Sequence, residues 1–127
     1  MKPPVEHVKV SVRGREILIK IKRTTGIEHW NEICRIALCK SLAIQTAPPK
    51  RAKTEDSNID MDWKTFAGKF QEELSALIIS RAQKDNINTK NKNELADYFK
   101  DHLERGILDM HGIKSLINLK EFIIQQK

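Results

Sequence analysis

The stretch "HVKVSVRGREILIKIKR", residues 7–23, decides the fold because it is compatible with two different structures. Apolar and polar residues alternate on both sides of "RGR" at 13–15, which is typical of a β-hairpin with a tight turn. Alternatively, one short strand runs through Val10, and Ser11 caps a helix that ends at Gly26. The alternation alone slightly favours the hairpin.

A helix gives the same stretch an apolar stripe. Ile17, Leu18 and Ile21 recur at three- and four-residue steps and so share one face of a helix. Ile19 falls outside this stripe, and we expect it at a contact between subunits. The stripe and the two helix-end signals together favour a short strand followed by a helix over residues 12–25.

The charge of the chain is unevenly distributed. The 127 residues carry a net charge of +6, and residues 2–23 alone hold seven lysines and arginines against two glutamates. This distribution predicts a polyanionic partner, because each phosphate that is neutralised releases condensed counterions. The alternative is a solvated basic face that has no partner.

The sequence shows neither a membrane span nor a secretory signal. Its apolar runs are far too short to cross a bilayer, and the first residues lack a hydrophobic stretch. We therefore expect a cytoplasmic protein without membrane contact.

Cys34 and Cys39 are five residues apart in an expected helix, where their side chains point in different directions. Both are interpreted as buried, reduced thiols.

Beyond the basic stretch the pattern is helical, apart from two polar segments. Residues 44–61 contain a Pro-Pro pair and few apolar residues, which is typical of a linker or a long surface loop. Residues 85–93 lack apolar periodicity and are expected to form a second loop. Amphipathic spacing predicts four further helices: 29–43; 62–83, capped by Asp62; 94–112, kinked or interrupted at Gly106 and ended by Gly112; and 113–127.

The predicted fold class is mainly α, in a single domain of residues 1–127. A basic strand-helix-helix segment (1–43) precedes the linker (44–61) and a C-terminal helical bundle (62–127). Strand, basic helix, Gly-containing turn and second helix follow each other as in the ribbon-helix-helix fold, where strands of two copies pair. A short strand is unstable alone, but the strands of two copies can pair across a dimer axis.

No catalytic constellation is visible in the sequence. There is no Walker loop, no GxGxxG and no GxSxG, and the four histidines show no metal-ligand spacing. We expect no enzymatic activity, no metal site and no cofactor. The most unusual polar cluster is "HLERG" at 102–106, in which His102 and Arg105 share a helix face. They form a phosphate contact or a catalytic pair, or they close hydrogen bonds with a neighbouring helix or the linker, which is favoured.

Two stretches resemble a known family. "IKRTTGIEHWNEICRIALCKSLA" at 21–43 is similar to a signature of the DndE family, the small component of the DNA sulfur-modification system, and "HLERGI" at 102–107 resembles its second signature. The resemblance implies a small, mainly helical protein that forms a homo-oligomer (a dimer or tetramer) and binds double-stranded DNA, with affinity for nicks. It also implies that other components of the complex, its partners, catalyse sulfur transfer.

Eight basic residues are the candidate DNA contacts. Lys22, Arg23 and Arg35 lie on motif positions of the family, and each can meet a phosphate without reading a base. Two other functions stay open. A ribbon-helix-helix regulator would prefer one operator sequence, and a nicking nuclease would need a carboxylate constellation that the sequence lacks. The candidates added from the basic stretch and from the helix after it are Lys9, Arg13, Arg15, Lys20 and Lys40.

Overall fold

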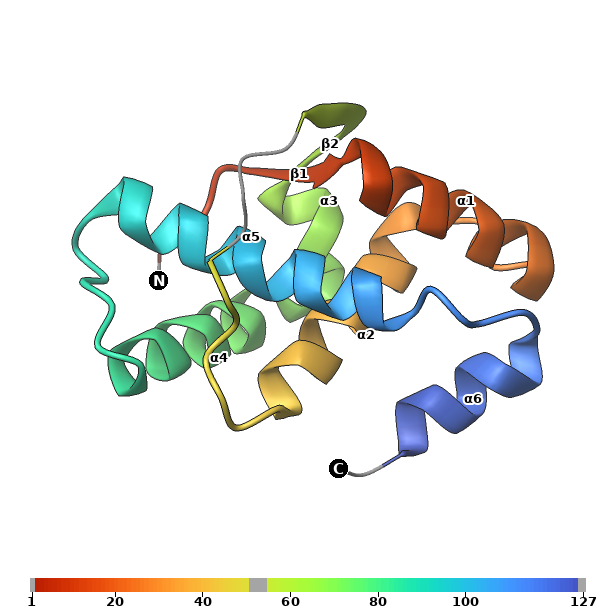
Figure 1. Cartoon of the computed structure of the whole chain (residues 1–127). Helices are drawn as coiled ribbons and strands as arrows, with labels where there is room; N and C mark the ends of the chain where they lie inside the picture. Colours follow the sequence, from red (N-terminus) through yellow and green to blue (C-terminus); the bar gives the residue numbers. More distant parts are fainter. Residues whose placement is uncertain (1, 51–54, 126–127) are drawn as a thin grey trace.

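The computed structural model describes residues 2–50 and 55–125 of the chain. The long helix α5 runs through the middle of the molecule, with two strands and α1 above it and α4 and α6 below it (Figure 1). Within the described ranges, no helix has the length and apolar character needed to cross a membrane. In chain order the elements are β1 (His7–Ser11), α1 (Val12–Thr25), α2 (Trp30–Ala43), β2 (Asp56–Asp62), α3 (Trp63–Ala67), the 3-10 helix η1 (Gly68–Phe70), α4 (Gln71–Lys84), α5 (Lys92–Asp109) and α6 (Leu116–Ile124).

The basic stretch forms a strand and a helix, and the mainly α fold class is confirmed. Ser11 is the last residue of β1 and the N-cap of α1, and its Oγ accepts a hydrogen bond from the Gly14 N–H at 2.9 Å. Gly26 ends α1 in the left-handed conformation with φ of 78°, and its N–H donates to Lys22 O. Both helix-end signals of the sequence therefore act as predicted.

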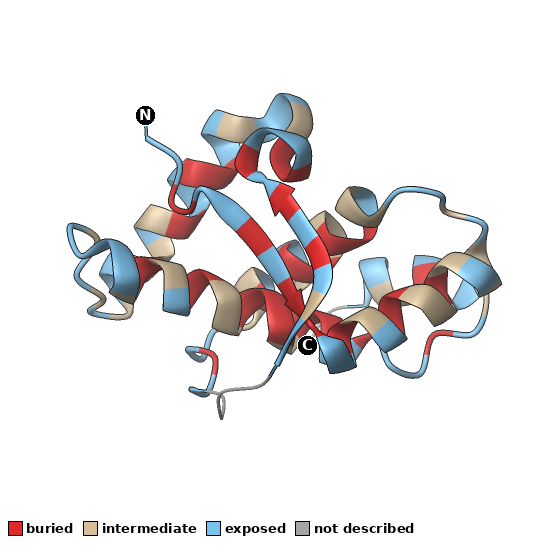
Figure 2. Cartoon of the chain, turned by 90° about the horizontal axis from the view of Figure 1, so that it is seen from above, coloured by how far each residue is buried: buried red, intermediate tan, exposed pale blue. Residues whose placement is uncertain are grey.

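Strand β1 pairs antiparallel with β2, which lies in the segment expected to be a loop. The linker prediction over residues 44–61 is therefore wrong for residues 56–61, and residues 51–54 of it lie outside the described residues. "DSNIDMD" has only two large apolar residues, Ile59 and Met61, which are buried between exposed polar ones. Buried and exposed positions alternate along both strands (Figure 2). Strand β1 thus has a partner within its own chain, whereas ribbon-helix-helix proteins take it from a second copy.

The helix expected over residues 62–83 is divided into α3, η1 and α4. The division lies at Gly68, whose φ of 57° is in the left-handed region and cannot continue a helix. The Arg35 guanidinium fills the space beside it, since a Cβ on Gly68 would lie 2.8 Å from Nη1. The predicted cap is confirmed, because the Asp62 carboxylate accepts a hydrogen bond from the Thr65 N–H at 2.7 Å.

Three aromatic rings lie at the centre of the core. Trp63 and Phe66 come from α3, Phe99 comes from α5, and their ring centroids are 5.5 to 5.9 Å apart. The two pairs that include Phe99 meet edge to face, an arrangement that aromatic quadrupoles favour. The short helix α3 thereby joins the sheet to the central helix.

Gly106 is the point where α5 and α2 come closest. A Cβ added to it would lie 1.9 Å from Ala37 O, so only glycine allows the two backbones to approach this far. Gly106 does not interrupt its helix, contrary to one of the two predictions for it, because α5 continues to Asp109. The predicted role of Gly112 as the helix end is also wrong, since the cap position of α5 is Met110.

The two cysteines differ in their surroundings. Both are free, as predicted, but only Cys34 is buried, and the prediction of burial is wrong for the exposed Cys39. Burial, with a smaller contribution from the nearby Glu104, raises the pKa of the Cys34 thiol to about 12. Cys34 therefore stays a neutral thiol in the core, where it acts as a small apolar side chain.

The close approach at Gly106 leads to a prediction for stability. We expect Gly106→Ala to lower the free energy of unfolding by about 3 kcal/mol or more, because the new methyl group overlaps the α2 backbone. This loss outweighs the gain of about 1 kcal/mol in helix propensity. Gly112→Ala is the matched control, since a Cβ there meets nothing within 4 Å. Urea unfolding of both variants measures the difference, and equal stabilities would contradict the packing described.

Candidate nucleic-acid interface

Helix α1 carries five of the eight predicted DNA-binding residues. Arg13 and Lys20 are seven residues apart and so lie on one flank of the helix, two turns from each other. Arg15 and Lys22 repeat this spacing on the opposite flank. Arg23 is exposed in the last turn. The structure thus brings these five cations together on one element, spread over both of its flanks and its outer side.

The inner side of α1 is the predicted apolar stripe. Ile17, Leu18 and Ile21 are all buried, which fixes the rotation of the helix on the core. The only acid of α1, Glu16, forms an exposed ion pair with Arg13 at 3.6 Å between Oε2 and Nη1. Exposed pairs of this kind contribute little, so the helix stays strongly basic.

A buried carboxylate from α5 holds the start of α1. Ser11 Oγ donates to Glu104 Oε1, and the Ser11 N–H donates to Glu104 Oε2 at 3.1 Å. The same Oγ accepts from the Gly14 N–H, so one hydroxyl links the carboxylate to the first turn of the helix. Glu104 is only 4% exposed. Because an acid at a helix N-terminus is also favoured by the helix dipole, Glu104 fixes where α1 begins.

The three remaining candidates lie away from α1. Lys9 is exposed on β1. The Arg35 guanidinium donates from Nη1 to Phe66 O at 3.0 Å, and the Lys40 ammonium donates to Gln125 O at 2.7 Å. Arg35 and Lys40 therefore have contacts within the chain that join α2 to α3 and to the end of α6.

His102 and Arg105 both bind Ser41, in the last turn of α2. Ser41 Oγ accepts from Arg105 Nε at 2.9 Å and lies 2.8 Å from His102 Nδ1, so its own hydrogen points to the imidazole. Arg105 also donates from Nη2 to Ser41 O and from Nη1 to Thr46 O, each at 2.9 Å. The favoured interpretation of this pair, hydrogen bonds with a neighbouring helix and the linker, is confirmed.

The imidazole of His102 is closed off from solvent. It is 0% exposed and packs edge to face against Tyr98, with ring centroids 4.7 Å apart. Burial, followed by the nearby Arg105 and Arg81, lowers the pKa of His102 to about 4, so the ring is neutral at pH 7. Within residues 2–50 and 55–125 no three His, Cys, Asp or Glu side chains are grouped so that they could hold a metal ion.

Arg81 of α4 binds the same end of α2 and is not among the residues predicted from the sequence. Its guanidinium donates to Leu42 O at 2.8 Å and to Gln45 O and Thr46 O at 2.9 Å. Its Nε also donates to the Asp85 carboxylate at 3.1 Å. The carbonyl groups at a helix C-terminus lack intrahelical partners, so the two arginines satisfy them and fix the chain that leaves α2.

A model of the family described as DNA sulphur modification protein DndE matches residues 7–118. The match begins at β1 and extends into α6, so it includes most of the chain. The chain belongs to the DndE family. It therefore takes part in DNA sulfur modification. A search of curated proteins finds no match.

The two stretches that resemble the DndE family have structural roles in this member. In the first, Thr25-Gly26 ends α1, and Ala37 forms the contact with Gly106. In the second, His102, Glu104 and Arg105 of "HLERG" bind α2, the start of α1 and the chain after α2, respectively. These motifs account for the position of the basic helix, and Trp30 of the first motif also contacts one of its cations, with the Lys22 ammonium 4.0 Å from the ring centroid.

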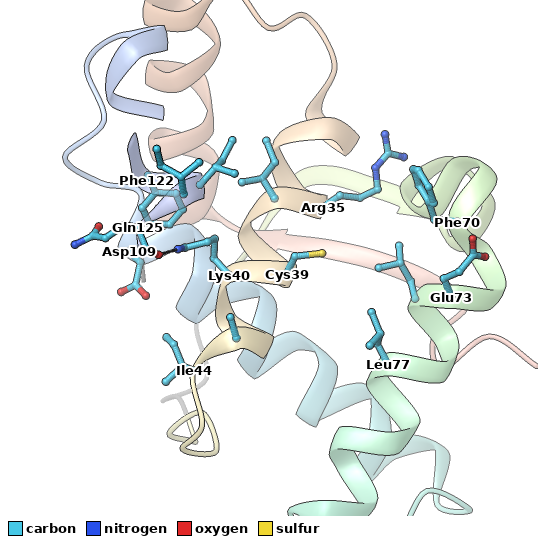
Figure 3. A pocket seen from close by; sticks show the side chains of 15 residues that line it. Arg35, Cys39, Lys40, Ile44, Phe70, Glu73, Leu77, Asp109, Phe122 and Gln125 are labelled. Atoms are coloured by element: carbon cyan, nitrogen blue, oxygen red, sulfur yellow. Dashed lines mark hydrogen bonds between the residues drawn. The ribbon is translucent and has the colours of Figure 1, made fainter. Parts of the chain in front are cut away.

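A groove lies between α2, α4 and α6 in this DndE family member. It has a volume of about 930 Å³ and is lined mostly by apolar side chains, among them Phe70, Leu77 and Ile124. Arg35 and Lys40 lie in it, together with the acids Glu73 and Asp109 (Figure 3), and no α1 residue lines it.

The cap of α1 can be tested against another cap. Ser11→Ala removes the cap and leaves the buried Glu104 without its hydroxyl partner, so we expect a loss of about 2–3 kcal/mol in unfolding free energy. Ser115→Ala is the matched control, because Ser115 caps α6 at the surface through the Asn118 N–H at 3.1 Å. A loss of about 1 kcal/mol is expected there. Equal losses in urea unfolding would show that the Glu104 bond adds nothing.

Protonation of His102 makes the stability depend on pH. Its pKa is about 4 in the folded protein and 6.5 in the unfolded chain, so the unfolded chain binds more protons between these values. This contribution is fully present above about pH 6.5 and is lost as the pH falls towards 4, by up to ~3 kcal/mol. Unfolding by urea at several pH values measures it. His102→Gln, which cannot titrate, should flatten this part of the profile, and an unchanged profile would contradict the assignment.

Proposed function

We propose that the protein is the DNA-binding subunit of the sulfur-modification machinery, and that it holds double-stranded DNA through α1. The observation that supports the proposal is a helix with five cations whose start is fixed by buried hydrogen bonds to Glu104. A cationic helix that is already ordered loses little conformational entropy when it meets phosphates.

The contacts proposed are to phosphates rather than to bases. A guanidinium can bind two phosphate oxygens, whereas an ammonium acts as a point charge, and neither needs a particular base. Cations on both flanks of α1 can reach the phosphates on both sides of a DNA groove. A nick lowers the cost of bending the duplex around the helix, which agrees with the affinity for nicks that the family resemblance implies.

We further propose that the protein catalyses no step of sulfur transfer and that partners in the complex do so. The most unusual polar groups, His102 and Arg105, are used in hydrogen bonds to Ser41 and the chain after it. His102 is also inaccessible to a substrate. The proposed role is therefore to place DNA for other components.

Binding to a labelled nicked duplex tests the proposal. The logarithm of the affinity should fall linearly with the logarithm of the salt concentration, and nicked duplex should bind more tightly than intact duplex. K20E/R23E on α1 should reduce the salt slope by about 2, because each lost phosphate contact reduces it by about 1.

K64E/K69E is the matched control for charge. Both lysines are exposed on α3 and η1, outside α1, and the net charge changes by the same amount. Its slope should stay close to that of the unchanged protein. The proposal is wrong if no duplex is retained at about 50 mM salt, or if the two double variants lose affinity equally.

We propose that the groove between α2, α4 and α6 binds a second copy of the chain. Leu77 and Ile124 are 52% and 67% exposed, which is unfavourable for side chains of this size in a monomer. The groove carries two cations, Arg35 and Lys40, and two acids, Glu73 and Asp109. This balance suits a two-fold interface, in which each cation can face an acid of the other copy.

Light scattering tests this interface. The protein should have a mass of two or four times 14.7 kDa. Leu77→Glu should raise the dissociation constant roughly 100-fold or more, because the interface would bury an unpaired carboxylate. Ser80→Glu is the control, since it places the same charge on an exposed position of α4 outside the groove. A monomeric protein, or equal effects of both changes, would contradict the proposal.

A further inference from the structure

A second basic surface lies away from α1. It is a cavity of about 1090 Å³ between the N-terminal residues, α4 and the first half of α5. We name it the lysine hollow. Its lysines come from the start of the chain, β1, the loop before α5 and α5 itself. They are Lys2, Lys9, Lys90, Lys92 and Lys100.

The hollow has an excess of positive charge. One of its lysines, Lys100, forms an ion pair with Asp56 of β2. Within the described residues, the ammonium groups of the other four have no hydrogen-bond or ion-pair partner. Two acids, Glu6 and Asp97, also line the hollow, so cations exceed acids even when Lys100 is left out. A negatively charged ligand is therefore the complementary one.

The lysines, and not the backbone N–H groups at the N-terminus of α5, determine which ligand the hollow suits. The Asn91 side chain accepts hydrogen bonds from the N–H groups of Asn93 and Glu94, so these donors of the first turn are occupied. Apolar residues such as Leu95 and Phe99 also line the hollow, but they are nearly fully buried. Four exposed ammonium groups around the hollow suit an extended row of phosphates.

The lysine hollow and α1 are two separate surfaces. The start of the chain and the loop before α5 lie on the left of Figure 1, and α1 lies on the right, with β1 between them. The same separation is visible from above (Figure 2). On the strand beside β1, Asp60 and Asp62 are exposed, and their carboxylates repel phosphates. A polyanion is therefore expected to contact the lysine hollow and α1 more closely than β2.

We propose that the lysine hollow is a second phosphate-binding surface, which contacts the same DNA duplex as α1. The proposal rests on the proposed function and extends it. Helix α1 is about 21 Å long and β1 about 16 Å. The two elements follow each other in the chain, and the hollow includes Lys9 of β1, so the hollow and α1 lie at neighbouring parts of one strand-helix unit. One duplex can thus meet α1 with one stretch of backbone and the hollow with another.

Salt-dependent binding of a fluorescein-labelled nicked duplex, longer than two helical turns, tests the second surface. K90E/K92E should reduce the salt slope by about 2 and weaken binding, since about two phosphate contacts are lost. K64E/K69E changes the net charge equally and should leave the slope unchanged. Circular dichroism checks that the variants fold, and K90Q/K92Q, which removes the charges without reversing them, should reduce the slope to a similar extent.

The outcomes separate the two proposals. If the unchanged protein fails to bind any duplex, the proposed function is wrong, and the second surface with it. If the protein binds and K20E/R23E weakens binding while K90E/K92E behaves like K64E/K69E, only the second surface is wrong. Protection of Lys90 and Lys92 from acetylation by the bound duplex, read by mass spectrometry, would support it further, and full reactivity of both would contradict it.

Discussion

The bond between the Glu104 carboxylate and Ser11 is the contact on which the arrangement of the molecule depends. Ser11 is the residue at which β1 ends and α1 begins, and its hydroxyl and N–H both donate to this carboxylate. The carboxylate is buried, so breaking either bond leaves a polar group without solvent to replace its partner. The basic helix is thus tied to the central helix at its first residue.

The position of α5 in turn depends on its contact with α2. Gly106 lets the two backbones meet at Ala37, and in the turn of α5 before this point His102 and Arg105 both bind Ser41. One short motif of α5 therefore orients both α1 and α2. This explains how a small protein can present a dense cluster of like charges: the repulsion among the cations acts on a helix whose position is fixed by packing and buried hydrogen bonds.

The strand and helix of the basic segment could be predicted because their end signals are local in the sequence. The other elements were predicted less well because they depend on contacts between residues that are distant in the sequence. Ser11 and Gly26 act locally, so their roles could be read from neighbouring residues. Strand β2 was missed because it is mostly polar and is stabilised by a partner distant in the sequence. The helix is broken at Gly68, which has a φ of 57° and lies beside Arg35 from another helix. A continuous helix was the natural expectation there, since glycine alone lowers helix stability only modestly.

The candidate site, too, could be predicted only where its residues are close together in the sequence. The five cations of α1 could be predicted from composition, but the contacts of Arg35 and Lys40 with other segments could not. Glu104 was also missed, because no neighbouring residue in the sequence marks this carboxylate as buried. The lysines of the hollow are distant in the sequence and meet only in the fold.

A crystal structure of the protein with a nicked duplex tests the central claim most directly. We expect phosphate oxygens within hydrogen-bond distance of the cations on α1, with Glu104 still bound to Ser11. A duplex bound against α4 and α6, with the side chains of α1 in solvent, would contradict it.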